Sequence, residues 1–201
     1  IVRLLLRLVE PDAGQIRLDG TPLADIAPEA LRAAIAVVPQ DVVLFDDSIE
    51  YNIAVAWPQA THQDIERAVQ VAQLEEFIDR LPGGYGTVIG ERGVRLSGGE
   101  RQRIAIARAA LRQPLIYVFD EATGALDSRT EQAILLNLRA LSRSATTLLI
   151  AHRLASVAHA ERIVVLHAGR VVESGPHEAL LRAQGQYAAL WRAQQMGEAA
   201  A

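Results

Sequence analysis

The stretch Leu96-Ser97-Gly98-Gly99-Glu100-Arg101-Gln102-Arg103 opens a helix that is expected to run from Ser97 to Arg112. Pro114 is expected to prevent the helix from continuing further. A helix start offers free backbone N–H groups and the positive end of the helix dipole, and both suit a phosphate group. The two glycines let a phosphate come close to the backbone. A simpler interpretation is a capping box between Ser97 and Glu100 with no ligand. This pattern alone leaves both interpretations open.

A second stretch, Leu115-Ile116-Tyr117-Val118-Phe119-Asp120-Glu121, is an apolar run that ends in two carboxylates. The run predicts a buried strand over Leu115–Phe119. An acid at the end of a buried strand is where phosphate-loop enzymes hold Mg²⁺, which favours Asp120 as a metal ligand. The next acid, Glu121, is suited to polarising a water for attack on a phosphoryl group. The simpler alternative is a solvated Asp-Glu pair at a strand end.

Two further polar residues follow apolar runs that predict strands. Gln40 comes after Ile35–Val38, where an amide can hold a water on a metal and sense movement. His152 comes after Thr146–Ala151, and an imidazole near a γ-phosphate can donate a hydrogen bond to the charge that develops there. Each also has a simpler interpretation, as a solvated glutamine on a loop and a structural histidine at a strand end.

Strands and helices alternate along the chain, and the strands are short and aliphatic. This alternation predicts an α/β domain with a parallel sheet. The middle of the chain, residues 41–112, is mainly helical and carries the stretch quoted first. We therefore expect one domain over residues 1–201, with an α/β core from residues 1–40 and 113–201 and a helical subdomain inserted at 41–112.

Local patterns predict the remaining elements. Asp127 is placed to cap a helix, and Thr61 with Asp64 forms a capping box for another. The dipeptide Asp19-Gly20 predicts a turn after the alternating run 15–19. The expected helices are 1–9, 28–34, 61–81, 127–142, 176–182 and 186–196, and two further strands are expected at 163–166 and 170–173.

The composition limits the possible functions. The net charge of −4 argues against a nucleic-acid groove or an anionic membrane patch as the main role. Every basic residue other than histidine is Arg, and there is no Cys for a disulfide or a thiolate metal site. No apolar run is long enough to span a membrane, and no signal peptide is visible. The other histidines lack metal-ligand spacing and are expected at the surface: His62, His159, His167 and His177.

Taken together, these stretches resemble the motifs of ABC ATPases. Residues 96–103 match the family's signature motif, and residues 115–121 resemble its Walker B motif with the catalytic glutamate. Residues 122–127 are similar to the D-loop, 39–41 to the Q-loop, and 151–154 to the segment with the switch histidine. The motifs follow the family order along essentially the whole chain. The resemblance implies the fold of a phosphate-loop NTPase with an inserted helical subdomain, incomplete at its N-terminus.

The resemblance also implies ATP and Mg²⁺ as ligands and assigns roles to single residues. Glu121 would orient or deprotonate the attacking water, and His152 would stabilise the γ-phosphate. Asp120 and Gln40 would hold Mg²⁺ and its waters. In the family, the signature motif acts on the ATP that is bound by the other subunit. The implied nucleotide-binding residues are Ser97, Gly98, Gly99, Glu100, Gln40 and Asp127.

Two features favour the exporter-type half-transporters within this family. The segment Gly90-Glu91-Arg92-Gly93 and the flanks of Gln40 resemble regions that touch the transmembrane domain in exporters. Residues 30–45, 127–134 and 187–195 are similar to the group with mitochondrial glutathione-compound exporters and heavy-metal tolerance transporters. The implied partners are a transmembrane domain fused upstream and a second ATPase domain in a head-to-tail dimer, at the cytoplasmic face of the membrane. No nucleic-acid partner is expected.

The family's phosphate loop, G-x-x-x-x-G-K-[ST], is not in the sequence, which contains no Lys. Residues 1–9 resemble the helix that follows this loop, so we expect the chain to begin after it. The parent protein is expected to be an ATPase, and the chain by itself to lack that activity. The alternatives are a soluble ABC ATPase of DNA repair or translation, the separate ATPase subunit of an importer, and a non-catalytic gene fragment.

Overall fold

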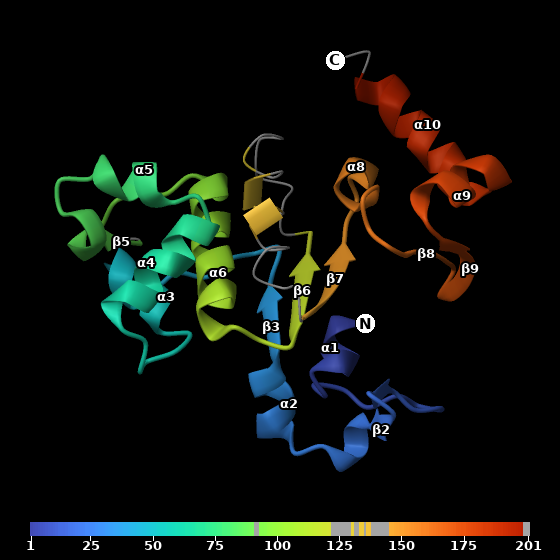
Figure 1. Cartoon of the computed structure of the whole chain (residues 1–201), viewed down its shortest axis with the longest axis horizontal. Coiled ribbons are helices and arrows are strands. Elements are labelled where there is room, and N and C mark those ends of the chain that lie inside the picture. The colour runs from blue at the N-terminus through green and yellow to red at the C-terminus, as the bar shows by residue number, and fades with distance from the viewer. Residues whose placement is uncertain (91–92, 122–129, 131–132, 135, 138–144, 199–201) are drawn as a thin grey trace. The chain divides into compact units, whose positions relative to one another are not determined.

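The structure is a computed structural model that describes residues 1–90, 93–121, 130, 133–134, 136–137 and 145–198 (Figure 1). The chain divides into two compact units, Ile1–Ile150 and Ala151–Ala201. Within the described residues, every helix is too short or too polar to cross a membrane.

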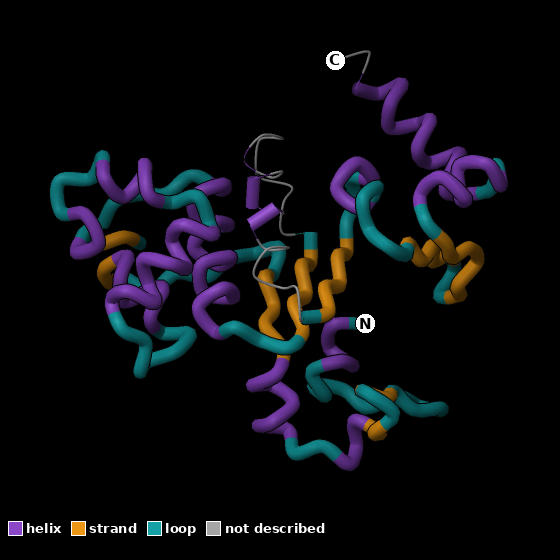
Figure 2. The backbone as a smooth tube through the Cα atoms, viewed as in Figure 1, coloured by secondary structure: helices purple, strands orange, loops and turns teal. Residues whose placement is uncertain are grey.

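A three-stranded parallel sheet forms the framework of the first unit (Figure 2). The strands β3 (Ile35–Val38), β6 (Ile116–Asp120) and β7 (Thr146–Ile150) lie in the order β3-β6-β7. Val38 pairs with Phe119, and Asp120 pairs with Ile150. Since the strands are parallel, their carboxyl ends meet at one edge of the sheet. The prediction of an α/β fold with a parallel sheet is confirmed.

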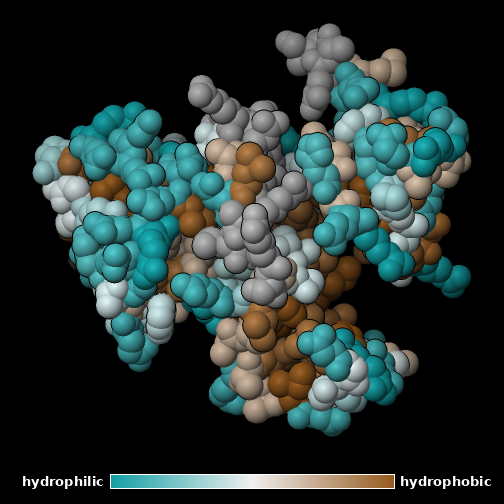
Figure 3. Space-filling view, in the orientation of Figure 1, coloured by the Kyte–Doolittle hydropathy of each residue, from teal (hydrophilic) through white to brown (hydrophobic). Residues whose placement is uncertain are grey.

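The N-terminal segment of this unit packs through aliphatic residues against the sheet. It comprises α1 (Val2–Leu5), the hairpin of β1 (Arg17–Leu18) and β2 (Thr21–Pro22), a 3₁₀ turn (Leu23–Asp25) and α2 (Pro28–Ala34). Hydrophobic surface gathers over this segment in Figure 3. The cluster beneath it contains Leu23, Leu31, Ile35, Ile116 and Val118. The predicted turn at Asp19-Gly20 and the predicted helix 28–34 are both present.

The helical part of the first unit is built around α6 (Gly98–Arg112). Alanines and isoleucines make up most of the buried face of α6, and they allow α4 (His62–Val71) and α3 (Ile49–Ala54) to pack closely against it. The remaining elements are β4 (Asp47–Ser48), α5 (Glu75–Asp79), the 3₁₀ turn Gly84–Gly86 and β5 (Val88–Ile89), which pairs antiparallel with β4.

Two expected helices are shorter than the sequence pattern predicted. The helix expected over 61–81 begins with the predicted capping box at Thr61 but breaks at Gln73, whose φ is +55°. This break turns Leu74 into the core, where it is fully buried. The helix expected over 1–9 ends at Leu5, and Arg7 adopts a φ of +51°. Its guanidinium then donates to backbone carbonyls of residues 23–26.

The second unit consists of a β-hairpin and three helices. Strands β8 (Ile163–His167) and β9 (Arg170–Gly175) pair antiparallel, and α8 (Leu154–Val157), α9 (His177–Ala183) and α10 (Gln186–Glu198) complete the unit. Its core contains Ile163, Val165, Leu180 and Tyr187. His177, which was expected at the surface, is half-buried because its ring packs against Tyr187 and Trp191.

Candidate functional site

The start of α6 is an exposed helix N-terminus with a complete capping box. The hydroxyl of Ser97 accepts a hydrogen bond from the Glu100 N–H at 3.3 Å, and the Glu100 carboxylate accepts one from the Ser97 N–H at 2.7 Å. Leu96 is buried just before the cap, whereas Ser97 and Gly98 are exposed. The capping box predicted as the simpler interpretation is therefore present. Gly98 and Gly99 lie in the first turn of the helix, at an N-terminus that a ligand could reach.

Three predicted residues come to the same edge of the sheet. Asp120 is the last residue of β6 and is half-buried, and Glu121 follows it with a φ of +51°. The Glu121 N–H donates to the Ile150 carbonyl at 2.9 Å, which fixes the backbone beyond the strand. Gln40 lies two residues after Val38, the partner of Phe119. Two carboxylates and an amide thus lie at or just beyond the carboxyl ends of two adjacent parallel strands.

The donor chemistry of this edge fits a magnesium ion bound together with phosphates. Mg²⁺ prefers oxygen ligands and is usually held by one or two carboxylates, with substrate phosphates and waters completing its shell. Asp120 supplies a carboxylate and Gln40 an amide oxygen at this edge. Among the described residues, no group of three or more His, Asp or Glu side chains forms a metal cage by itself. The arrangement suits a metal that arrives with a phosphate ligand.

The helix α6 is tied directly to the segment that carries Gln40. The side chain of Gln102 is buried on α6, and its Nε2 donates to the Pro39 carbonyl at 3.1 Å. The exposed start of α6 and the segment with Gln40 at the sheet edge are therefore connected through this helix and this hydrogen bond.

A buried polar network holds the chain that follows Gln40. Asn52 is fully buried, and its Nδ2 donates to the carbonyls of Phe45 and Ser48, both at 3.0 Å. Arg108 on α6 donates to the Asn52 carbonyl and side chain and to the Val43 carbonyl, at 2.6–2.9 Å. Burial lowers the pKa of the Arg108 guanidinium, which remains charged because its ordinary pKa is so high. The network fixes segment 43–48 against α6.

Gly90 brings a second segment against this one. Its φ is +117°, and a Cβ at this position would lie 2.2 Å from the Asp46 carboxylate, so only glycine fits. Glu91 and Arg92, which were expected to face a partner, lie outside the described residues. The same holds for Asp127 and for residues 122–126, the segment similar to a D-loop.

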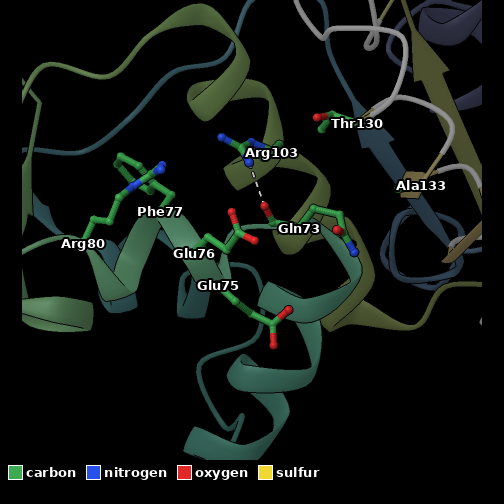
Figure 4. Close-up of a pocket in the computed structure, with 8 residues that line it drawn as sticks. All are labelled: Gln73, Glu75, Glu76, Phe77, Arg80, Arg103, Thr130 and Ala133. Carbon is green, nitrogen blue, oxygen red and sulfur yellow. Dashed lines mark hydrogen bonds between the residues drawn. The ribbon is translucent and has the colours of Figure 1, made fainter.

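A cavity of about 400 Å³ lies between residues of α5 and Arg103 of α6 (Figure 4). In this cavity, the guanidinium of Arg103 donates to the Gln73 carbonyl at 2.6 Å. Gln73 has a positive φ, at the break after α4. Among the residues that the structure describes, the lining consists of Gln73, Glu75, Glu76, Phe77, Arg80, Arg103, Thr130 and Ala133, and none of these is a predicted site residue.

His152 belongs to the second unit and is exposed there. Its backbone carbonyl accepts a hydrogen bond from Nε2 of Gln194 on α10. The Oε1 of Gln194 accepts from the Leu154 N–H at 2.9 Å. The backbone that carries the imidazole is therefore held by the C-terminal helix.

Sequence reasoning missed the residues that support these segments. Gln102, Arg108 and Gln194 each contact a segment that is at least 40 residues away in the chain. Asn52 gave one usable signal, because it stands between Ile49 and Ile53 on the apolar face of a short helix. For the others the sequence alone holds no comparable signal.

The sequence and the fold of this chain are similar to those of known proteins. The family model "ABC transporter" matches residues 1–124. An "ATM1-type heavy metal exporter" of Novosphingobium aromaticivorans is 50% identical over 200 residues, which are 100% of this chain and 33% of that protein. An "ATP-dependent lipid A-core flippase" of Alkalilimnicola ehrlichii is 52% identical over 195 residues, 96% of this chain and 33% of that protein.

A solved structure, "Structure of a bacterial Atm1-family ABC exporter with ATP bound", superposes with a TM-score of 0.93 at 49% identity. It covers 96% of this chain, and the chain covers 34% of it. The chain thus spans about a third of the length of these relatives.

Proposed function

The chain belongs to the ABC transporter family, and on this premise we propose that it is most of the ATPase domain of an Atm1-type exporter. The whole protein would couple ATP hydrolysis to the transport of a solute across a membrane. The observation that carries this proposal is the sheet edge where Gln40, Asp120 and Glu121 meet, tied through Gln102 to the exposed start of α6. The two relatives described above are named as an exporter and a flippase. Their names favour an exporter over an importer subunit or a soluble ABC ATPase.

The residues at the sheet edge have distinct roles in this proposal. Asp120 and Gln40 would hold Mg²⁺ and its waters, and this ion would supply positive charge that offsets the charge of the ATP phosphates. Glu121 orients or deprotonates the attacking water, and its backbone bond to Ile150 keeps it at the strand end. For His152, which belongs to the second unit, the proposed role is the one that the family resemblance implies, a hydrogen bond to the γ-phosphate as charge develops there.

The exposed start of α6 serves a second nucleotide in this proposal. Ser97, Gly98, Gly99 and Glu100 present a helix N-terminus to the ATP held by a second ATPase domain, in a head-to-tail dimer. Asp127 links the two sites across that dimer. The segments near Gln40 and Glu91 pass closure of the dimer to a transmembrane domain, which places this chain at the cytoplasmic face of the membrane.

The transported solute is not assigned by this chain. Two relatives of nearly equal identity are named for different cargoes, a heavy metal and a lipid A core. Contacts with the solute are expected in the transmembrane domain.

Equilibrium binding of Mg·ATP tests this proposal. The 201 residues contain no phosphate loop, so we expect the full-length protein to bind Mg·ATP and the isolated chain to show no detectable binding by calorimetry. Circular dichroism would first establish that the isolated chain is folded. Clear binding and hydrolysis by the folded chain alone would contradict the active site described here.

A further inference from the structure

We propose that Gln194 is a positioning residue for His152, which it holds in place through the backbone. The inference rests on the proposed function, in which the His152 imidazole acts on the γ-phosphate. It assigns the C-terminal helix α10 a part in hydrolysis, although α10 carries none of the predicted site residues.

Gln194 forms hydrogen bonds on both sides of Arg153. Its Nε2 donates to the His152 carbonyl, and its Oε1 accepts from the Leu154 N–H at 2.9 Å. Only one orientation of the amide satisfies both bonds, because the oxygen can only accept and the nitrogen can only donate. One side chain therefore fixes the two consecutive peptide units that flank Arg153 and directly follow the histidine.

These bonds act on a segment of backbone that lies between two elements of secondary structure. Strand β7 ends at Ile150 and α8 begins at Leu154, so residues 151–153 belong to no helix or strand. The backbone groups of such a segment are satisfied by side chains or water. The amide of Gln194 supplies protein partners for two of these groups.

Gln194 is on α10, which follows α9 along the chain (Figure 1), and side-chain contacts anchor this helix near its start. Tyr187, near the start of α10, is 1% exposed, and its N–H donates to the Glu173 carboxylate at 2.7 Å. Its hydroxyl lies 2.8 Å from Nδ1 of His177, and Trp191 packs edge-on against the same imidazole with ring centroids 4.5 Å apart. Trp191 and Gln194 are three residues apart and share one face of α10. The aromatic anchor thus sets the position of Gln194.

The consequence concerns the rate of the chemical step. Catalytic groups must be placed accurately, and an error of about 1 Å can cost about 100-fold in rate. If His152 acts on charge that develops during the reaction, loosening its backbone lowers kcat and leaves ATP binding nearly unchanged.

Steady-state ATPase kinetics of the full-length protein test this inference with three variants. Gln194→Ala removes both bonds and is expected to lower kcat about tenfold, with the KM for ATP changed less than about twofold. Gln194→Glu keeps the acceptor for Leu154 but places a carboxylate against the His152 carbonyl, so it is expected to lower kcat at least as much. Gln195→Ala, at the exposed neighbour on the same helix, is expected to retain the wild-type kcat.

A double-mutant cycle separates positioning from general destabilisation. In a His152→Ala background, Gln194→Ala is expected to cause no further loss of kcat, because the group it positions is already gone. A wild-type kcat in Gln194→Ala, or losses that multiply with those of His152→Ala, would overturn the inference. Full activity of His152→Ala would instead refute the role of the histidine, and a wild-type protein without ATPase activity would refute the proposed function.

Discussion

The buried amide of Gln102 donates from Nε2 to the carbonyl oxygen of Pro39 at 3.1 Å, and so joins the helix that begins at Ser97 to the residue before Gln40. The two residues are 63 positions apart in the chain. A substitution at Gln102 should therefore affect the segment that carries Pro39 and Gln40.

Replacing Gln102 by methionine keeps the side-chain volume and removes the donor. We expect the free energy of unfolding to fall by about 1 kcal/mol, because the Pro39 carbonyl loses its protein partner. Urea denaturation of the purified protein measures this change. Gln63→Met, at an exposed position on α4, is the matched control and should leave stability unchanged. Equal stability of the two variants would show that the bond contributes nothing.

The network around Asn52 predicts a larger effect. Asn52→Leu has nearly the same shape but leaves the carbonyls of Phe45 and Ser48 and the guanidinium of Arg108 without this partner. We expect a loss of about 3 kcal/mol in the free energy of unfolding, since several polar groups lose bonds inside the core. Asn52→Asp keeps an acceptor for the Phe45 N–H and for Arg108 but loses the donor to the carbonyls, so it should also be destabilised. A loss below about 1 kcal/mol for the leucine variant would mean that water replaces the network.

Two substitutions at Ser97 separate its structural role from its proposed role toward phosphate. Ser97→Ala removes the cap and should cost about 1 kcal/mol of stability. Ser97→Asp restores a good cap but places a negative charge where the phosphate is expected. We therefore predict that Ser97→Asp has near wild-type stability and a lower ATPase rate than Ser97→Ala. An aspartate variant with wild-type ATPase activity would show that no phosphate binds there.

His62 predicts a pH-dependent contact between α4 and α3. Its hydrogen bond to Glu50 is the main cause that raises the pKa of the imidazole above 6.5; desolvation opposes this increase, and the charges of Glu50 and Glu66 add smaller increases. Because the folded pKa is raised, the stabilisation is fully present below about 6.5 and is lost as the pH rises through the folded pKa. Histidine NMR titration should give a larger decrease in the pKa of His62 for Glu50→Gln than for Glu66→Gln. The reverse order would contradict the assigned geometry.

Local patterns in the sequence were enough to predict part of this fold. The helix 28–34 and the strand 35–38 have the predicted bounds, because a proline at the first helical position and a β-branched apolar run act over a few residues. The break at Gln73 was not predicted, since it depends on burial of Leu74 in the core.

The sequence was enough to predict that polar residues stand at or just after the ends of strands, and their roles stay predictions. The structure places Gln40, Asp120 and Glu121 at one edge because parallel strands end together. The hydrogen bonds of Gln102 and Gln194 that hold the neighbouring backbone could not be predicted, because tertiary packing determines which backbone groups these side chains reach. Asp127 lies outside the described residues, and its role stays a prediction.

The measurement that tests the central claim most directly is Mg·ATP binding and turnover by the full-length protein and its Glu121→Gln variant. The account predicts that the wild type hydrolyses ATP, and that the variant binds ATP with similar affinity while its turnover falls by about 100-fold or more. Because glutamine keeps the shape of the side chain, a folding defect should not contribute. Near wild-type turnover by Glu121→Gln would contradict the assignment of the sheet edge as the catalytic site.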